Sequence, residues 1–156
     1  MGVEMPVPAR LRPLGGWWRA LGRLAAGTRA PASEEARRTY LALALDLLAR
    51  ADALHAEWCT ELEERRQHEQ LANAAAVYHW RLHVLRERLR LAGVPPALQG
   101  WHRVLLASLD DACHGLRLIS SGYRYYYVRR ICQGERLLDE ARQQVAAVRD
   151  LFAAQA

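Results

Sequence analysis

The chain has 156 residues, of which 51% are hydrophobic and 25% charged. A single domain of this length can bury about two-thirds of its unfolded surface, so its stability requires neither disulfides nor metals. No stretch of about 18 apolar residues occurs, which argues against a membrane-spanning helix. Arginines interrupt the N-terminal segment where a signal peptide would need its apolar core, and we therefore expect a soluble protein.

The cysteines bear on the cellular compartment of the protein, and the basic residues bear on what its surface can bind. Cys59, Cys113 and Cys132 are odd in number and far apart, which favours a reducing compartment and a cytoplasmic location. All 22 basic residues are arginine, and the net charge is +5. Codon bias in a GC-rich bacterial genome is the simpler explanation. The alternative is a surface that binds phosphate or carboxylate through the guanidinium fork.

Residues 1–32 form a basic leader that differs from the rest of the chain. It holds five arginines against Glu4 alone, a net charge of +4. In a helical conformation its apolar residues share one side, and Arg19 and Arg23 fall on another. The apolar residues are Leu14, Trp17, Trp18, Leu21 and Leu24. Such a segment can cap its own bundle, insert tryptophans into the groove of a partner protein, or lie on an anionic membrane surface.

From residue 33 onward, the periodicity of apolar residues predicts long helices. Ser33 is a suitable N-cap and two glutamates follow it, so the first helix is expected from residue 33 to about residue 65. The polar stretch 63–70 predicts a corner. One unbroken helix over 33–92 is the alternative, because neither glycine nor proline interrupts that range.

Glycine and proline mark the remaining helix boundaries. The second helix is expected from about residue 69 to Gly93, where two prolines follow. The third runs from Pro96 to about Ser121 with Gly122 as its C-terminal stop, and the fourth covers about 123–153. Because the apolar register nearly continues through Gly122, one long rod is the alternative for the last two helices.

Each predicted helix carries an apolar stripe with spacings of three and four residues, and no run alternates as a strand would. The expected core positions are Leu41, Leu45, Leu48, His55, Cys59 and Leu62; Leu71, Ala75, Tyr78, Leu82, Leu85 and Leu89; His102, Leu105, Leu109, Cys113 and Leu116; and Tyr127, Ile131, Gly134, Leu138, Ala141, Val145, Val148 and Phe152. A second stripe on the first helix consists of Tyr40, Leu47, Leu54 and Trp58.

These faces are too wide for a simple coiled-coil seam, and the connections between helices are short. The sequence therefore predicts an all-α fold, an antiparallel up-down-up-down four-helix bundle over residues 33–156. The alternative is a long two-helix hairpin folded at Gly93–Pro96, which would form a homo-oligomer to cover its exposed seam. Gly115 and Gly134 are expected to mark a close approach between helices.

The segment 123–130, with the sequence YRYYYVRR, holds four of the six tyrosines and three arginines. Its candidate binding residues are Tyr123, Arg124, Tyr125, Tyr126, Arg129 and Arg130. Tyrosine with arginine is typical of protein-interface hot spots. The same mixture suits nucleic acid, where rings stack on bases and arginines bind phosphates. The structural alternative is that Tyr123 and Tyr127 continue the core register while the others line a corner.

Two groups of residues are candidate metal ligands. Asp52, His55 and Cys59 share one side of the first predicted helix, and Asp111 with His114 repeats the Asp-x-x-His spacing on the third. The glutamates of a di-iron site are not in register, so buried Asp–His pairing is the favoured interpretation.

A basic side of the second predicted helix is a candidate for anion binding. It consists of His79, His83, Arg86 and Arg90. Arginines in a last helical turn more often complement the helix dipole, which is the favoured interpretation here. No phosphate-binding loop, nucleophile elbow or HExxH motif occurs, so we expect neither a cofactor nor enzymatic activity.

The sequence thus predicts a non-enzymatic helical adaptor or accessory subunit of a larger protein assembly, which docks through the leader and through 123–130. The leader residues in contact would be Trp17, Trp18, Arg19, Leu21, Arg23 and Leu24. The first alternative is a nucleic-acid-binding subunit with Arg117, Arg124, Arg129 and Arg130 on phosphates. The second is a peripheral protein of an anionic membrane surface.

Overall fold

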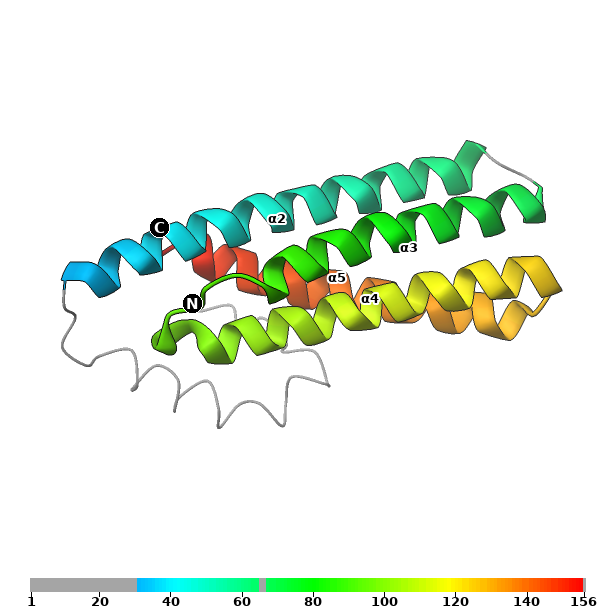
Figure 1. The fold of residues 1–156 in the computed structure, drawn as a ribbon. Helices are drawn as coiled ribbons and strands as arrows, with labels where there is room; N and C mark the ends of the chain where they lie inside the picture. The colour runs from blue at the N-terminus through cyan, green and yellow to red at the C-terminus, as the bar shows by residue number, and fades with distance from the viewer. Residues whose placement is uncertain (1–30, 65–66, 156) are drawn as a thin grey trace, which may run out of the picture.

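The structure, a computed structural model, describes residues 31–64 and 67–155 (Figure 1). Its elements are the helices α2 (Pro31–Glu64), α3 (His68–Arg90), α4 (Gln99–Tyr125) and α5 (Val128–Ala153), with a short 3-10 turn, η2 (Pro96–Leu98), before α4. No strand occurs in these two ranges. None of the helices in them combines the length and apolar character that crossing a membrane requires. The predicted leader lies outside the described residues, apart from its last two positions.

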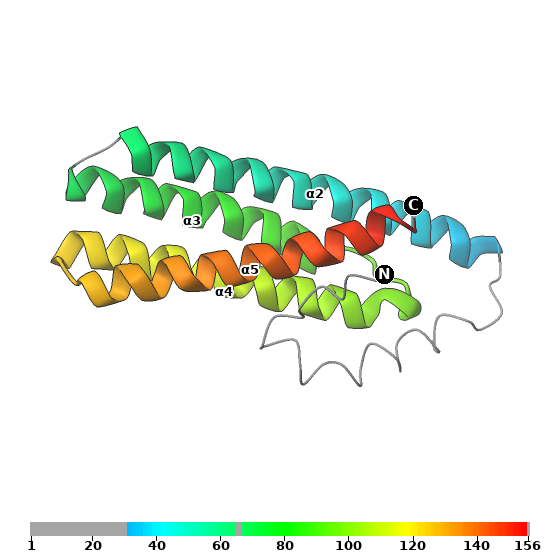
Figure 2. The ribbon, with the colours of Figure 1, turned by 180° about the vertical axis from the view of Figure 1, so that it is seen from behind.

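The four helices form the predicted antiparallel bundle. Figures 1 and 2 show consecutive helices side by side and running in opposite directions. The α2–α3 corner and the α4–α5 turn lie at one end of the bundle, and the α3–α4 connection lies at the other. α4 packs closely against both α3 and α5, whereas α2 packs mainly against α3. The two-helix hairpin and the unbroken helix over 33–92 are therefore wrong.

Two predicted boundaries need correction. α2 begins at Pro31, two residues before the expected N-cap Ser33. α4 does not stop at Gly122 but continues to Tyr125, and the chain reverses at Tyr126, so the single rod is also wrong. Gly122 is buried inside the helix because α5 approaches it there. A Cβ at Gly122 would lie 2.6 Å from Cγ1 of Ile131, so this glycine serves close packing and not helix termination.

The predicted core stripes of α3 and α4 are confirmed, since all of their residues are buried. On α2 the prediction was partly wrong, because Leu45, His55 and Leu62 are only half-buried and Cys59 is exposed. The buried residues of α2 are Tyr40, Leu41, Ala44, Leu47, Leu48, Leu54 and Trp58. The side of α2 that faces the core thus includes the whole second stripe, together with Leu41 and Leu48 of the first stripe.

Two glycines bring α4 and α5 into direct backbone contact, as predicted. Both Gly115 and Gly134 are buried. A Cβ on Gly115 would lie 2.7 Å from the carbonyl oxygen of Gly134, and a Cβ on Gly134 would lie 2.5 Å from the carbonyl oxygen of Gly115. This close packing holds α4 and α5 together as one hairpin, and it positions the turn between them.

One polar pair lies in the core near the opposite end of the bundle. The Tyr40 hydroxyl and Nδ1 of His102 share a hydrogen bond of 3.0 Å, and the Phe152 ring packs edge-on against Tyr40 at 6.1 Å. Burial raises the pKa of Tyr40 and lowers the pKa of His102. The two side chains thus provide each other with a hydrogen-bond partner, and both stay neutral near pH 7.

We expect the bundle to lose stability as the pH falls below about 6.5, the ordinary histidine pKa. Burial is the main cause that lowers the pKa of His55, His79 and His102 in the folded chain. Below about pH 6.5 the unfolded chain therefore binds more protons than the folded chain does. The free energy of unfolding keeps its full value above this pH and decreases as the pH falls below it. Thermal unfolding from about pH 8 to pH 5 measures this. His102→Gln should give a shallower decline, and a flat wild-type profile would contradict the expectation.

Candidate functional site

The α4–α5 turn exposes four consecutive large side chains, Tyr125 to Val128, which we call the tyrosine tip. The exposed fractions are 60% for Tyr125, 72% for Tyr126, 55% for Tyr127 and 69% for Val128. The expectation that Tyr127 belongs to the core was wrong, because the helices converge at Gly122 and leave no interior space beyond it. Tyr123, one turn earlier, is half-buried and packs against the core.

The backbone of the turn orients these rings outward. Tyr126 adopts the left-handed conformation, with φ 59° and ψ 34°, and it is the only non-glycine residue with positive φ in the described chain. The N–H of Tyr127 donates to the carbonyl of Gly122 at 2.8 Å. Glycine or asparagine usually occupies such a position after a helix. A bulky tyrosine there costs conformational energy, which suggests that its side chain has a use.

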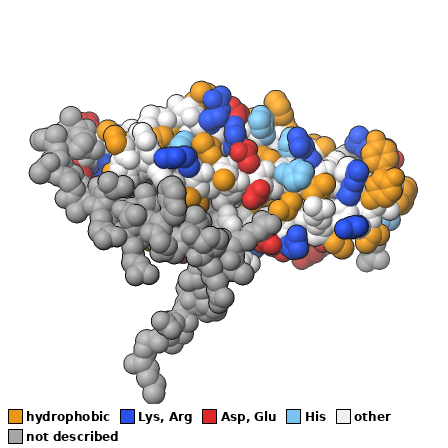
Figure 3. Space-filling model, turned by 90° about the horizontal axis from the view of Figure 1, so that it is seen from below, with side chains coloured by type: hydrophobic (Ala, Val, Ile, Leu, Met, Phe, Trp, Pro, Cys, Tyr) orange, Lys and Arg blue, Asp and Glu red, His pale blue; other side chains and the backbone are white. Residues whose placement is uncertain are grey.

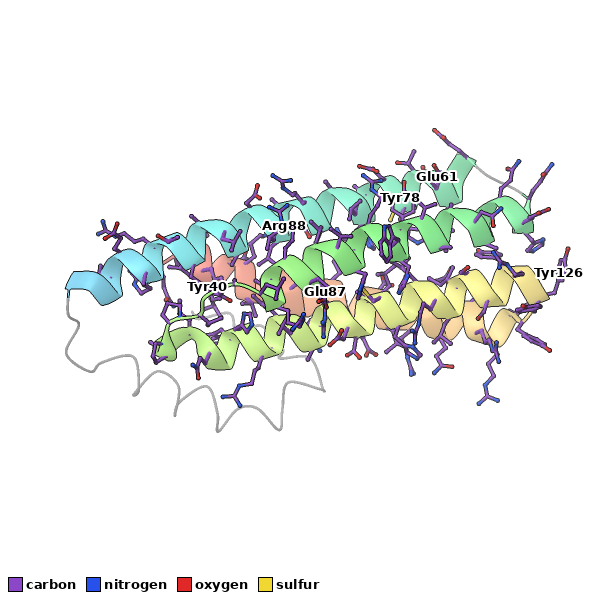
Figure 4. All side chains as sticks on the ribbon, viewed as in Figure 1. Tyr40, Glu61, Tyr78, Glu87, Arg88 and Tyr126 are labelled. Carbon is purple, nitrogen blue, oxygen red and sulfur yellow. The ribbon has the colours of Figure 1, made fainter. Side chains whose placement is uncertain are left out.

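Aromatic and cationic contacts hold the tyrosine tip together. Cζ of Arg130 lies over the Tyr127 ring at 5.1 Å, and the rings of Tyr125 and Tyr127 are 6.4 Å apart. The His68 ring, at the start of α3, packs against the Tyr126 ring at a tilt of 57°, with ring centres 5.1 Å apart. Figure 3 shows hydrophobic and basic side chains gathered at one end of the molecule, and Figure 4 places Tyr126 at the α4–α5 end.

Five of the six residues predicted for this segment are exposed around the turn. They are Arg124, Tyr125, Tyr126, Arg129 and Arg130. The structure adds Tyr127 and Val128 to this surface, and it places Tyr123 beneath it. The candidates of the leader, Trp17, Trp18, Arg19, Leu21, Arg23 and Leu24, lie outside the described residues.

A shallow basic groove of about 280 Å³ adjoins the tyrosine tip between α3 and α4. It is lined by Ala76, His79, Arg117, Ser120, Ser121, Arg124 and Tyr125. Arg124 donates to Oδ1 of Asn73 at 3.2 Å, which positions this guanidinium at the groove. Burial, and next the charge of Arg117, lower the pKa of His79. The groove is therefore suited to an anion, and its Tyr125 edge joins it to the tip.

The arginines of the predicted anion-binding side of α3 are already paired with carboxylates. Arg86 binds Asp110 on α4 through two hydrogen bonds of 2.9 and 3.0 Å. Arg90 binds Glu87 at 2.8 Å, and Arg86 also contacts Glu87. This side therefore serves to attach α3 to α4 and has little capacity for an external anion.

The candidate metal ligands are not brought together. Asp52 accepts a hydrogen bond from Arg149 of α5, which corrects the expected Asp–His pairing. Nε2 of His55 lies 3.4 Å from Sγ of Cys59. His114 is exposed, away from the core. Within residues 31–64 and 67–155, no three histidine, cysteine, aspartate or glutamate side chains are placed to hold a metal ion.

A small, partly open pocket lies between the helices in the described part of the chain. Its volume is about 40 Å³, and apolar side chains such as Trp58, Leu82 and Leu109 line most of it. Sites for cofactors or small molecules are usually about 300–1,000 Å³. This pocket is therefore too small for such a ligand.

Comparison with known proteins adds no assignment, since no protein-family model, curated protein or solved structure matches this chain.

Replacing Tyr126 by glycine should stabilise the fold by about 0.5–1 kcal/mol, because glycine adopts positive φ without steric cost. Loss of the contact with His68 offsets part of this gain. Chemical denaturation measures the change, and Tyr125→Gly is the matched control. Tyr125 has helical φ, so glycine there should destabilise by a similar amount. A loss of stability in Tyr126→Gly as large as in the control would disprove the strain.

Sequence reasoning missed one exposed apolar surface, the outer face of α3. Val77, Trp80 and Val84 lie there, all at least 41% exposed. Their spacing of three and four residues was readable in the sequence, on the side of the helix opposite to the predicted core stripe.

Proposed function

We propose that this protein is a non-enzymatic binding subunit that attaches to a larger protein assembly through the tyrosine tip. The observation that carries the proposal is the exposure of Tyr125, Tyr126, Tyr127 and Val128, all above 50%, on one rigid turn. Exposed apolar patches on small proteins mark interaction sites, and tyrosine and arginine are enriched among hot-spot residues. A turn fixed by backbone packing also loses little conformational entropy on binding.

The chemistry of the tip indicates the kind of partner. Three ring faces and a valine would bury apolar area in a groove of the partner. Arg124, Arg129 and Arg130 surround them and would pair with carboxylates at its rim. The leader, with Trp17 and Trp18, is proposed as a second contact of the same assembly. The separated cysteines favour a cytoplasmic setting for it.

A nucleic-acid partner is the second candidate, and the basic groove supports it. Arg117, Arg124 and His79 would bind phosphates there, and Tyr125 at the groove edge would stack on a base. Salt distinguishes the two candidates. Binding that releases counterions from phosphates should weaken steeply between about 50 and 200 mM salt, whereas tyrosine-anchored protein binding should change little.

A photo-crosslinking amino acid at position 126 of the full chain tests the proposal. The same probe at Gln143, an exposed position on α5, is the control. We expect position 126 to capture a defined protein in the native host, and position 143 not to capture it. Identical products at both positions would refute the tip as a binding site, and RNA or DNA adducts specific to position 126 would support the second candidate instead.

A further inference from the structure

The basic groove between α3 and α4 holds two positive charges that no carboxylate compensates. Its lining residues include Arg117, Arg124 and His79, and none of them is an aspartate or a glutamate. Among the residues that the structure describes, neither arginine lies within ion-pair distance of a carboxylate. Arg124 donates to the neutral side-chain amide of Asn73, which leaves its charge in place. The groove therefore has an excess of positive charge.

Short side chains keep the groove hollow between the two arginines. Arg117 and Arg124 are seven residues apart on α4, which places them on one side of the helix and two turns apart. Ala76 of α3 and Ser120 of α4 line the groove between them. The Ser120 hydroxyl donates to the carbonyl of Ala72 at 2.8 Å and so attaches α4 to α3 at this level. An anion in this hollow would have a guanidinium group on either side.

His79 adds a neutral hydrogen-bond donor at the Arg117 end of the groove. Burial, and next the charge of Arg117, lower the pKa of His79, so its ring is neutral near pH 7. A neutral imidazole still carries one N–H. The ring of His83 stacks on the His79 ring, with ring centres 6.2 Å apart and 14° between the ring planes. The groove thus combines two guanidinium groups with one ring N–H, and all of these are donors.

The uncompensated charge does not continue along the α3–α4 edge away from the tyrosine tip. There Arg86 of α3 binds Asp110 of α4, and Arg90 binds Glu87. A nucleic-acid strand is usually bound by a basic groove that follows several successive phosphates. A single phosphoryl group needs only one local cluster of arginines. The distribution of charge therefore favours one isolated phosphoryl group as the ligand.

We propose that the groove binds one phosphate monoester, carried by a phosphorylated side chain of the protein that binds the tyrosine tip. Near pH 7 such a group carries between about 1.5 and 2 negative charges, which matches the two arginines, and guanidinium forks bind its oxygens in pairs. Tyr125 belongs to both the tip and the groove, so a protein seated on the tip also lies beside the groove. This inference rests on the proposed function, because it places the phosphoryl group on the partner of the tip.

NMR titration of the full chain at about pH 7.5 tests the groove without the partner. The probes are inorganic phosphate, an acetylated phosphoserine amide and dimethyl phosphate. We expect the first two to shift the amide signals of residues 117–124 and the ring signals of His79. Dimethyl phosphate, a diester with one charge like a nucleic-acid linkage, should bind at least about tenfold more weakly because it carries less charge and fewer free oxygens.

Arg117→Gln should weaken binding of the phosphoserine probe at least about tenfold, since it removes charge-assisted hydrogen bonds. Arg103→Gln is the matched control, because it removes the same charge from an exposed position on the same helix, and it should leave the affinity unchanged. Equal affinities of the two variants overturn the groove as a phosphate site. Equal affinities of the wild type for the monoester and the diester also overturn the proposal, in favour of nucleic acid.

Phosphatase treatment of the protein captured at position 126 tests the source of the phosphoryl group. The treatment should weaken binding to the wild type at least about tenfold and should leave binding to Arg117→Gln unchanged. An unchanged affinity for the wild type overturns the phosphorylated partner, while the tip remains its binding site. If position 126 captures no protein, the proposed function and the phosphorylated partner fail together, whereas a failure of the NMR titration concerns the groove alone.

Discussion

Replacing Gly134 by valine is expected to lower the free energy of unfolding by about 3 kcal/mol. Its Cβ would lie 2.5 Å from the carbonyl oxygen of Gly115 and 2.7 Å from Cγ1 of Ile119. The first of these contacts is with backbone, which cannot rotate away as the end of a side chain can. α4 and α5 must therefore separate, and the closest packing in the bundle is lost.

Gly93→Val is the matched control for this change. A Cβ at Gly93 meets nothing within 4 Å, and its φ is not positive, so the stability should stay within about 0.5 kcal/mol of the wild type. Urea denaturation of the three proteins gives the comparison. Equal stability of Gly134→Val and the wild type would show that α4 and α5 do not approach as described.

Removing the rings of Tyr125 and Tyr126 together should weaken binding of the proposed protein partner at least about 100-fold. Hot-spot side chains contribute about 2 kcal/mol or more each, and every 1.4 kcal/mol is tenfold in affinity. The suitable variant is Tyr125→Ser with Tyr126→Asn, because asparagine tolerates the left-handed backbone at position 126. The turn should keep its shape while it loses its exposed apolar area.

The affinity of this double variant is measured by calorimetry with the partner that crosslinking at position 126 identifies. Leu151→Ser serves as the control, since it removes exposed apolar surface from α5 near its C-terminal end. Equal affinities of the double variant and this control would remove the tyrosine tip from the interface. A wild-type affinity that falls steeply with rising salt would indicate that the arginines, and not the rings, provide most of the binding energy.

The sequence predicted the bundle well where each helix has one apolar face. On α3 and α4 a single stripe with spacings of three and four met the core, and every predicted position is buried. On α2 two adjacent stripes make one wide apolar face, and the periodicity cannot say which part of this face meets the core. The packing of α2 decides it, since Leu41 and Leu48 of the first stripe are buried together with the second stripe, whereas Leu45 and Leu62 are half-buried.

The position of the α4–α5 turn was predicted wrongly because a glycine has two different structural roles in helical proteins. Glycine ends helices, and it also allows helices to approach. The predicted stop at Gly122 is therefore wrong, since this glycine serves close contact with Ile131. The actual reversal at Tyr126 has no local signal, since tyrosine is uncommon in the left-handed conformation. The local enrichment in tyrosine and arginine over residues 123–130 nevertheless predicted the candidate surface, because it does not depend on the exact position of the turn.

Hydrogen exchange of the full chain, with and without its crosslinked partner, tests the central proposal most directly. Binding at the tyrosine tip should slow amide exchange at residues 124–130 and at the adjacent start of α3 around His68, whose ring packs against Tyr126. Slowed exchange confined to other surfaces, with residues 124–130 unchanged, would contradict it.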